Sequence, residues 1–149
     1  MTEFPPEYQI SLPLARVDLD LSGDPDLIRL ARLTVSGVAS TSGLGLEESE
    51  RCRAAVDELC TMLFELAHQD ARLSLSVATD GKRLLVSGAM PKDGSKAPDP
   101  VRQQLGDLIL SSTVTEWSLD TDADPCGFWF SFDPSVPRDD EAPAAEGEP

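Results

Sequence analysis

Basic residues are scarce in this sequence. Its 149 residues include 12 Lys and Arg against 27 Asp and Glu, so the formal net charge is −15 at pH 7. A protein that binds nucleic acid or an anionic membrane needs a basic surface to neutralise phosphates. The few basic residues are scattered and form no stripe, so we expect neither nucleic acid nor a membrane surface as a partner.

Long apolar segments and paired cysteines are also missing. No apolar run approaches the roughly 20 residues that span a bilayer, and Met1 to Glu7 carry acids and prolines where a signal peptide would carry basic residues. We therefore expect a cytoplasmic protein. The cysteines Cys52, Cys60 and Cys126 are odd in number and form no C-x-x-C pair, which favours buried free thiols. Cys126 lies in a loop-like segment and is expected to be the most reactive of them.

The length and a hydrophobic fraction of 40% fit a single domain over residues 1–133, followed by an acidic, proline-rich tail at 134–149 that we expect to be disordered. Alternating apolar residues predict strands, and apolar spacings of three and four predict helices. The predicted strands lie at about 8–21, 72–79, 82–89, 113–119 and 127–132, and the predicted helices at about 25–39, 46–66 and 101–110. Asp80 and Gly81 are expected to form a two-residue hairpin turn. The order β-α-α-β-β-α-β-β predicts an α+β sandwich, with helices covering one face of a mixed or antiparallel sheet.

Motifs for catalysis and metal binding are sparse. The sole histidine, His68, ends the second predicted helix, where an interaction with the last carbonyls is the simpler role than catalysis. The alternating acids Asp120, Asp122 and Asp124 resemble part of a calcium loop, but they lack its glycine and its bidentate Glu, so we expect a hydrated turn. Neither of the two common phosphate-binding loops, G-x-x-x-x-G-K-[ST] and G-x-G-x-x-G, occurs.

The most specific motif is AVDELCT at residues 55–61, in the second predicted helix. Its acids Asp57 and Glu58 are expected to be solvated, as most helix acids are. Together with RLARLTVSGVAS and GLEESERCRAA, the motif resembles the two-helix start of the RsbW/UsfX-type anti-sigma factors. These bacterial proteins have the histidine-kinase-like ATPase (Bergerat-type) fold. The resemblance implies this two-layer sandwich for residues 17–132.

The resemblance also implies a nucleotide site, of which this sequence keeps a part. In the kinase-active members a Glu of this helix orients the attacking hydroxyl, and an Asn four residues later binds magnesium. Glu58 matches the Glu, whereas Met62 stands at the Asn position, and a thioether is no ligand for magnesium. The adenine-recognising D-x-G-x-G does not follow LLVSGAM directly, and Asp93 and Gly94 are displaced candidates for it.

The family's partners give a second set of candidate residues. Arg29 matches an arginine that family members place early in the first helix, at the surface that contacts partner proteins, and Arg32 lies on the same side of that helix. A solvated arginine is the alternative interpretation of Arg29. For Glu58 the alternatives are a catalytic and nucleotide-binding role, with Asp93 and Gly94, or a salt-bridged or partner-facing helix acid.

The resemblance therefore predicts a homodimeric anti-sigma factor of a stress response, without a cofactor. This protein would sequester an alternative sigma subunit of RNA polymerase until an anti-anti-sigma (STAS-domain) protein competes for it. The alternative within the same family is a serine protein kinase that phosphorylates its antagonist with ATP and magnesium. A third possibility is a scaffold module that has neither activity.

Overall fold

The computed structural model describes residues 14–137. The elements in chain order are β1 (Ala15–Ser22), the short 3-10 helix η2 (Pro25–Leu27), α1 (Ile28–Thr41), α2 (Leu46–Leu66), β2 (Arg72–Thr79), β3 (Leu84–Met90), α3 (Pro100–Thr113), β4 (Glu116–Asp120) and β5 (Cys126–Phe132). This order is the one predicted from the sequence. Residues 8–13 of the first predicted strand, and residues 138–149 of the predicted tail, lie outside the described residues.

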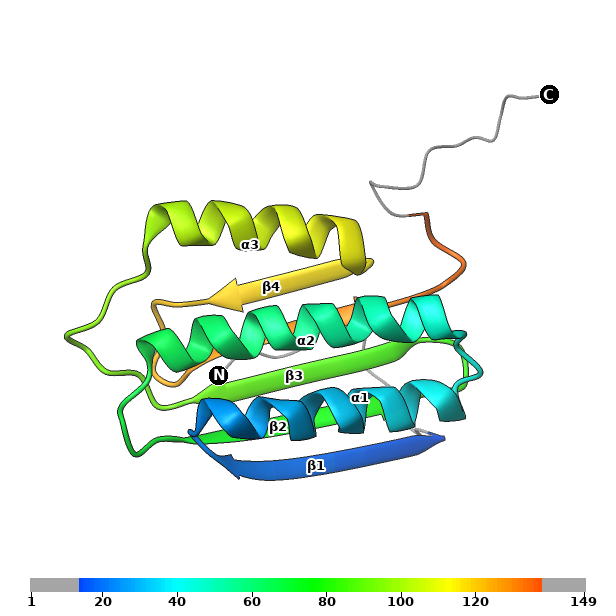
Figure 1. Cartoon of the computed structure of the whole chain (residues 1–149), viewed down its shortest axis with the longest axis horizontal. Coiled ribbons are helices and arrows are strands. Elements are labelled where there is room, and N and C mark those ends of the chain that lie inside the picture. The colour runs from blue at the N-terminus through cyan, green and yellow to red at the C-terminus, as the bar shows by residue number, and fades with distance from the viewer. Residues whose placement is uncertain (1–13, 138–149) are drawn as a thin grey trace.

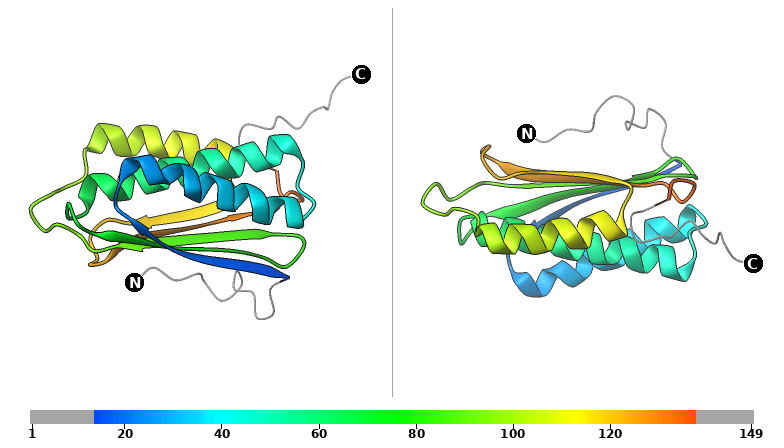
Figure 2. Two further views of the ribbon diagram at one scale, coloured as in Figure 1. Left: turned by 60° about the horizontal axis from the view of Figure 1, so that its bottom comes forward. Right: turned by 90° about the horizontal axis from the view of Figure 1, so that it is seen from above.

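The five strands form one antiparallel sheet in the order β1-β2-β3-β5-β4. Figure 1 shows α1, α2 and α3 side by side across the sheet, with α2 between the other two. All three helices lie on the same face, as the edge-on views in Figure 2 show. The protein is therefore the two-layer α+β sandwich that the sequence predicts. None of the described helices is long and apolar enough to cross a bilayer.

The hydrophobic core fills the space between the helices and the sheet. In β2 every second side chain points into it, which is the two-residue alternation that predicts this strand. The core includes Leu59, Leu63, Leu73, Val77, Phe128, Phe130 and Phe132, all of them fully buried. Burying a large apolar side chain contributes roughly 1.5–3 kcal/mol, so these contacts fix α2 on the sheet.

The start of α1 follows the sequence prediction, but its buried face is rotated. The carboxylate of Asp24 accepts a hydrogen bond from the N–H of Asp26 at 2.9 Å, and Pro25 takes the first helical position. The first turn is a 3-10 helix, which is wound more tightly than an α-helix and shifts the residues that follow. Ile28 is buried, whereas the apolar Leu30 is 38% exposed.

The connection between β2 and β3 has four residues rather than the predicted two. Thr79 pairs with Leu84, which leaves residues 80–83 outside the sheet. The carboxylate of Asp80 accepts hydrogen bonds of 2.9 Å from the backbone N–H groups of Lys82 and Arg83. These bonds keep both amides out of the strand ladder, and Gly81 supplies the positive φ of 94° that the turn requires. The prediction of a two-residue turn is therefore wrong, although the predicted position of the turn in the chain is correct.

The third helix buries a different face from the one its sequence suggests. Val101, Leu105 and Leu108 are among the apolar residues that predict it, yet they are 73%, 53% and 71% exposed. Leu110 is fully buried in the core. The periodicity thus locates the helix correctly but does not identify the side that packs against the protein.

The three cysteines are buried free thiols, as predicted. Cys126 lies at the start of β5, and its thiol donates to the backbone carbonyl of Met90 at 3.4 Å. Burial raises the pKa of Cys126, and it raises the pKa of Cys60 to about 12 with a further contribution from the nearby Asp57 carboxylate. Since a buried thiol with a raised pKa is unreactive, the expectation of a loop-like, reactive Cys126 is wrong.

Candidate functional site

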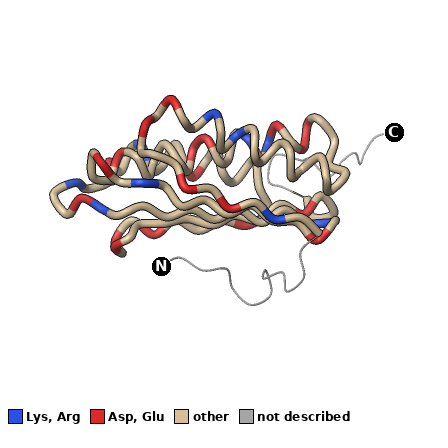
Figure 3. The backbone as a smooth tube through the Cα atoms, turned by 90° about the horizontal axis from the view of Figure 1, so that it is seen from below, with Lys and Arg blue, Asp and Glu red and all other residues tan. Residues whose placement is uncertain are grey.

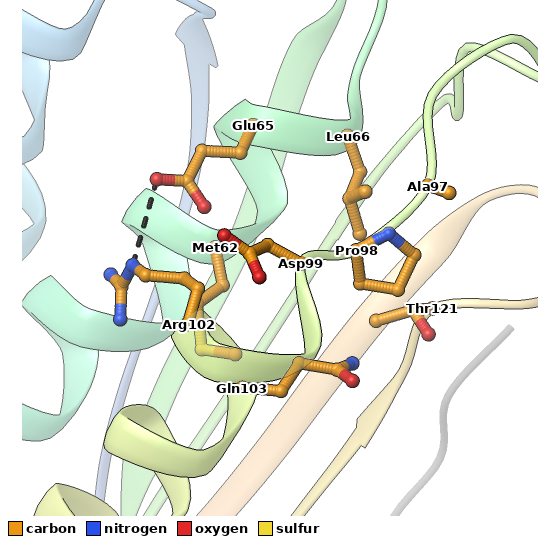
Figure 4. A pocket seen from close by; sticks show the side chains of 9 residues that line it. All are labelled: Met62, Glu65, Leu66, Ala97, Pro98, Asp99, Arg102, Gln103 and Thr121. Carbon is orange, nitrogen blue, oxygen red and sulfur yellow. Dashed lines mark ion pairs between the residues drawn. The ribbon is translucent and has the colours of Figure 1, made fainter.

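A cleft of about 290 Å³ opens between the C-terminal half of α2, the start of α3 and the β4–β5 turn (Figure 4). Ligand pockets in proteins usually have about 300–1,000 Å³, so this cleft is at the lower limit. It is lined by Met62, Glu65, Leu66, Ala97, Pro98, Asp99, Arg102, Gln103 and Thr121. Because Met62 stands at the position of the magnesium-binding Asn, this cleft is where the resemblance places a nucleotide.

Met62 lies between α2 and α3 and is only 4% exposed. Gly106 of α3 packs directly on it: a Cβ atom at position 106 would lie 2.9 Å from the Met62 sulfur and 3.1 Å from a Glu58 carboxylate oxygen. A glycine inside a helix costs roughly 0.5–1 kcal/mol relative to alanine. Here the missing side chain lets α3 approach α2 closely over the two positions where the family binds its nucleotide.

Arg102 of α3 pairs with two acids of α2. Its guanidinium donates to the carboxylate of Glu58, whose side chain is 12% exposed, and its Nε lies 3.6 Å from the carboxylate of Glu65. The hydrogen bond with Glu58 raises the pKa of Arg102, so the cation is permanent. The expectation that Glu58 is simply solvated is wrong, because burial beneath α3 requires a compensating charge. In this arrangement Glu58 is a salt-bridged helix acid.

Asp93 and Gly94 lie in the connection between β3 and α3, and neither lines the cleft. The carboxylate of Asp93 accepts hydrogen bonds from the hydroxyl of Ser95 at 2.7 Å and from its N–H at 2.9 Å, and these bonds lower the pKa of Asp93. The N–H of Asp93 donates to the carbonyl of Leu66 at 2.9 Å. Asp93 therefore shapes its own loop and anchors it to the end of α2.

The two arginine candidates lie on the outer side of α1. Arg29 is exposed, and Arg32, almost one turn later, donates to the carboxylate of Asp57 on α2. Asp57 is 47% exposed and paired, so it is not simply solvated as expected. A shallow groove of about 320 Å³ runs between the two helices, lined by Arg32, Glu50, Arg53, Ala54 and Asp57. This groove is a polar surface between α1 and α2.

The described residues contain no group of three or more His, Cys, Asp or Glu side chains placed to hold a metal ion. The carboxylate of Asp120 accepts hydrogen bonds of 3.1 Å from the N–H groups of Asp122 and Ala123, and that of Asp124 accepts one of 3.0 Å from the N–H of Lys92. These acids hold the β4–β5 turn. His68 lies exposed beyond the end of α2.

Sequence reasoning missed two residues of α3: Arg102, which lines the cleft, and Gly106, which packs on Met62. One signal was available for the first of them. Between Ala97 and Pro137 the chain has a single basic residue, Arg102, and a lone cation among many acids is a candidate ion-pair partner. For Gly106 the sequence holds no comparable signal, because its role depends on the distance between two helices.

Known proteins resemble this chain over most of its length. The serine-protein kinase RsbW of Bacillus velezensis is 30% identical to it over 105 residues, which are 68% of this chain and 65% of that protein. RsbW of Bacillus subtilis strain 168 matches with the same identity and coverage. RsbW of Bacillus pumilus is 29% identical over 105 residues, covering 67% of this chain and 64% of that protein. The chain is related to RsbW.

This relationship to RsbW agrees with the architecture. One five-stranded antiparallel sheet with three helices on one face is consistent with the histidine-kinase-like ATPase fold, so the predicted fold class is confirmed. The chain spans just under two thirds of the length of the RsbW relatives it matches. No family model matches the chain.

The resemblance to the kinase-active family members implies ATP and magnesium, and the residues of the cleft can be compared with what these ligands require. Magnesium prefers oxygen ligands in near-octahedral geometry, whereas the position that should supply one holds the thioether of Met62. The second required group, the Glu58 carboxylate, is bound by Arg102. The displaced adenine candidate Asp93 is hydrogen-bonded to Ser95 and does not line the cleft. This donor set does not fit a magnesium nucleotide, and we derive no reaction step from one.

Proposed function

We propose that this protein is an anti-sigma factor that sequesters an alternative sigma subunit of RNA polymerase. An anti-anti-sigma protein with a STAS domain releases the sigma subunit by competing for the same surface. The proposal includes a cytoplasmic homodimer that acts in a stress response, as the resemblance to the RsbW/UsfX-type proteins implies. Its support is the relationship to RsbW at 30% identity.

The ion pair between Arg102 and Glu58 is the observation that favours binding over catalysis. In a kinase of this fold, the matching Glu must be free to orient the hydroxyl that attacks the nucleotide. Here α3 covers that carboxylate, and Met62 lies next to it in place of the magnesium ligand. A protein that only binds its partners needs neither group.

The surface proposed for partner binding is the outer side of α1, with Arg29 and Arg32, and the groove between α1 and α2. Arginine is enriched at the centres of protein interfaces because its planar guanidinium makes paired hydrogen bonds to carboxylates and carbonyls. Arg29 is exposed and is available for such a contact. Arg32 is held by Asp57 on α2, which fixes its guanidinium at the edge of the groove.

The second candidate function, a serine protein kinase acting on its antagonist, is favoured by the printed name of the relatives. One experiment separates the two candidates. The full chain, immobilised, is used to capture proteins from a lysate of its own organism, and the captured proteins are identified by mass spectrometry. We expect a sigma subunit, and we expect a captured or added STAS-domain protein to displace it without ATP.

Two results of the same experiment would contradict the proposal. Capture of neither a sigma subunit nor a STAS-domain protein removes the anti-sigma function. Phosphoserine on the STAS-domain protein after incubation with ATP and magnesium establishes the kinase instead. A chain carrying Glu58→Gln controls for contaminating kinases, because it should lose phosphorylation only if the activity belongs to this protein.

A further inference from the structure

The exposed side of α3 is a continuous apolar stripe. Val101, Leu105 and Leu108 are 73%, 53% and 71% exposed, and their spacings of four and three residues place them on one face of the helix. The charged residue Arg102 and the small Gly106 face α2 instead. The helix buries Leu110 in the core, but these three apolar side chains lie on its outer side.

The orientation of α3 is fixed by several independent contacts. Asp99 accepts a hydrogen bond from the N–H of Val101 at 3.0 Å and so caps the helix. Arg102 pairs with Glu58 and Glu65, and Gly106 packs so closely on Met62 that a Cβ atom at position 106 would require the Met62 side chain to shift. Turning the helix to bury its leucines would break both ion pairs and bring a larger side chain into the position of Gly106. The apolar stripe therefore remains on the surface of the folded protein.

The segment that contains this stripe is mostly acidic, and Arg51 of α2, which donates to the carbonyl of Ser112, is a basic residue at the end of α3. Figure 3 shows acidic positions distributed over both layers of the molecule. From Ala97 to Pro137 the only basic residue is Arg102, which is already paired with two carboxylates. The same segment contains the acids Asp99, Asp107, Glu116, Asp120, Asp122, Asp124 and Asp133. Electrostatic complementarity thus favours a basic partner.

A second copy of this chain is a poor occupant for the stripe. It would bring a matching stripe with the same acids, and each copy carries a formal charge of −15. A stable protein interface buries about 800 Å² on each partner, with some 20–30 residues a side. Three side chains on one helix provide only a small fraction of that, which suits the docking of one short segment.

We propose that the α3 stripe is a docking site for a basic amphipathic helix of a protein partner. The apolar side of that helix lies along Val101, Leu105 and Leu108, and Lys or Arg residues at its flanks face Asp99 and Asp107. Amphipathic helices are commonly recognised through apolar anchors at such spacings. This site lies on the other side of α2 from Arg29 and Arg32, so it is separate from the surface proposed for sigma binding (Figure 1).

The test uses the full chain and a fluorescent designed peptide of leucine and lysine, with its leucines on one helical face. We expect binding by fluorescence anisotropy with a micromolar Kd. The double variant Leu105→Ala with Leu108→Ala should weaken it at least tenfold. The matched control is Leu33→Ala, because Leu33 on α1 is 63% exposed and lies outside the stripe. This control should stay within twofold of the wild type.

A peptide with glutamate in place of lysine should bind at least tenfold more weakly than the lysine peptide. The proposal would be overturned if the Leu33 control and the double variant lost the same amount of affinity. The peptide would then be bound by the acidic surface in general and not by the stripe.

Self-association is measured by sedimentation equilibrium. If the double variant abolishes it, the stripe is assigned to a second copy of the chain. Unchanged thermal midpoints of the variants, expected for exposed residues, show that they are folded. We expect the double variant to bind the sigma subunit as the wild type does. The test of the stripe and the test of the proposed function can therefore fail independently.

Discussion

The guanidinium of Arg102 on α3 binds the carboxylate of Glu58 on α2, and this contact holds α3 over the side of α2 that carries Met62. The chain therefore uses Glu58 as a structural anchor, although this position matches the Glu that kinase-active family members use for catalysis.

Replacing Arg102 with alanine should lower the free energy of unfolding by about 1–3 kcal/mol, because the Glu58 carboxylate is left without its partner in a largely buried place. Urea denaturation followed by circular dichroism measures the change. Arg32→Ala is the matched control: Arg32 and Asp57 are 36% and 47% exposed, and an exposed ion pair contributes about 1 kcal/mol or less. Equal losses in the two variants would show that burial of Glu58 is not what makes the first pair important.

Restoring an asparagine at the magnesium position by Met62→Asn should destabilise the protein by roughly 1–3 kcal/mol, since an amide would be buried beneath α3 without a hydrogen-bond partner. ATP with magnesium should raise the thermal midpoint of neither the variant nor the wild type. Micromolar, magnesium-dependent ATP binding by the wild type in calorimetry would contradict this prediction and favour the kinase.

Leu59→Ala tests which face of α2 packs on the core. The substitution should lower the free energy of unfolding by about 2–5 kcal/mol, because Leu59 is fully buried. Leu46 begins the same helix and is 76% exposed, so Leu46→Ala should change the stability by no more than about 0.5 kcal/mol. Chemical denaturation of both variants makes the comparison. A loss below half a kcal/mol at Leu59 would mean that the helix packs through another face.

The pKa of Cys60 predicts a dependence of stability on alkaline pH. Burial raises this pKa from 9.0 to about 12, so the folded chain holds the thiol proton more tightly than the unfolded chain does. The contribution of this pKa difference to the free energy of unfolding is fully present below pH 9 and is lost as the pH rises toward 12. Cys60→Ala should therefore make the decline of stability over this interval shallower. An unchanged decline would show that other groups cause it, and rapid alkylation of the native wild type would show that the thiols are accessible.

Arg29→Ala should weaken binding of the captured sigma subunit by roughly 1–3 kcal/mol, as loss of an interface arginine commonly does. Its unfolding free energy should change by no more than about 0.5 kcal/mol, because the side chain is exposed. Surface plasmon resonance and urea denaturation are measured on the same preparations. Arg16→Ala on β1 is the control, since Arg16 is also exposed but lies on the opposite face of the sheet. Binding within twofold of the wild type would place the sigma surface elsewhere.

The helices and strands were predictable because their signals are local. The apolar residues that predict α2 recur at helical spacing, and all but Leu46 are buried. They are Leu46, Cys52, Ala55, Val56, Leu59, Cys60, Leu63 and Leu66. The face of α3 was not predictable in this way. Its three outward apolar residues follow the same pattern as core residues, and only the contacts of Arg102 and Gly106 with α2 decide which side is buried.

The residue types at the candidate site could be predicted from the sequence better than their arrangement in space. The match of Glu58 and the mismatch at Met62 could be read from one helix, because their four-residue spacing fixes them on one face. The partner of Glu58 comes from a helix that begins more than thirty residues later in the chain. No pattern within a single element identifies such a pair, since it arises only when α2 and α3 are brought together on the sheet.

The strand order has a consequence for how the cleft forms. The sheet contains two local hairpins, β2–β3 and β4–β5, joined through the pairing of β3 with β5, and β1 is added at the edge of β2. Closing that pairing encloses a long loop, which makes it an entropically costly step of folding. The cleft is lined by Met62 of α2, a helix that packs on β3 and β5, and by Thr121 of the β4–β5 turn. The cleft thus exists only once the hairpins have joined. A molecule that binds in the cleft would therefore stabilise the pairing of β3 with β5 and raise the free energy of unfolding of the whole domain.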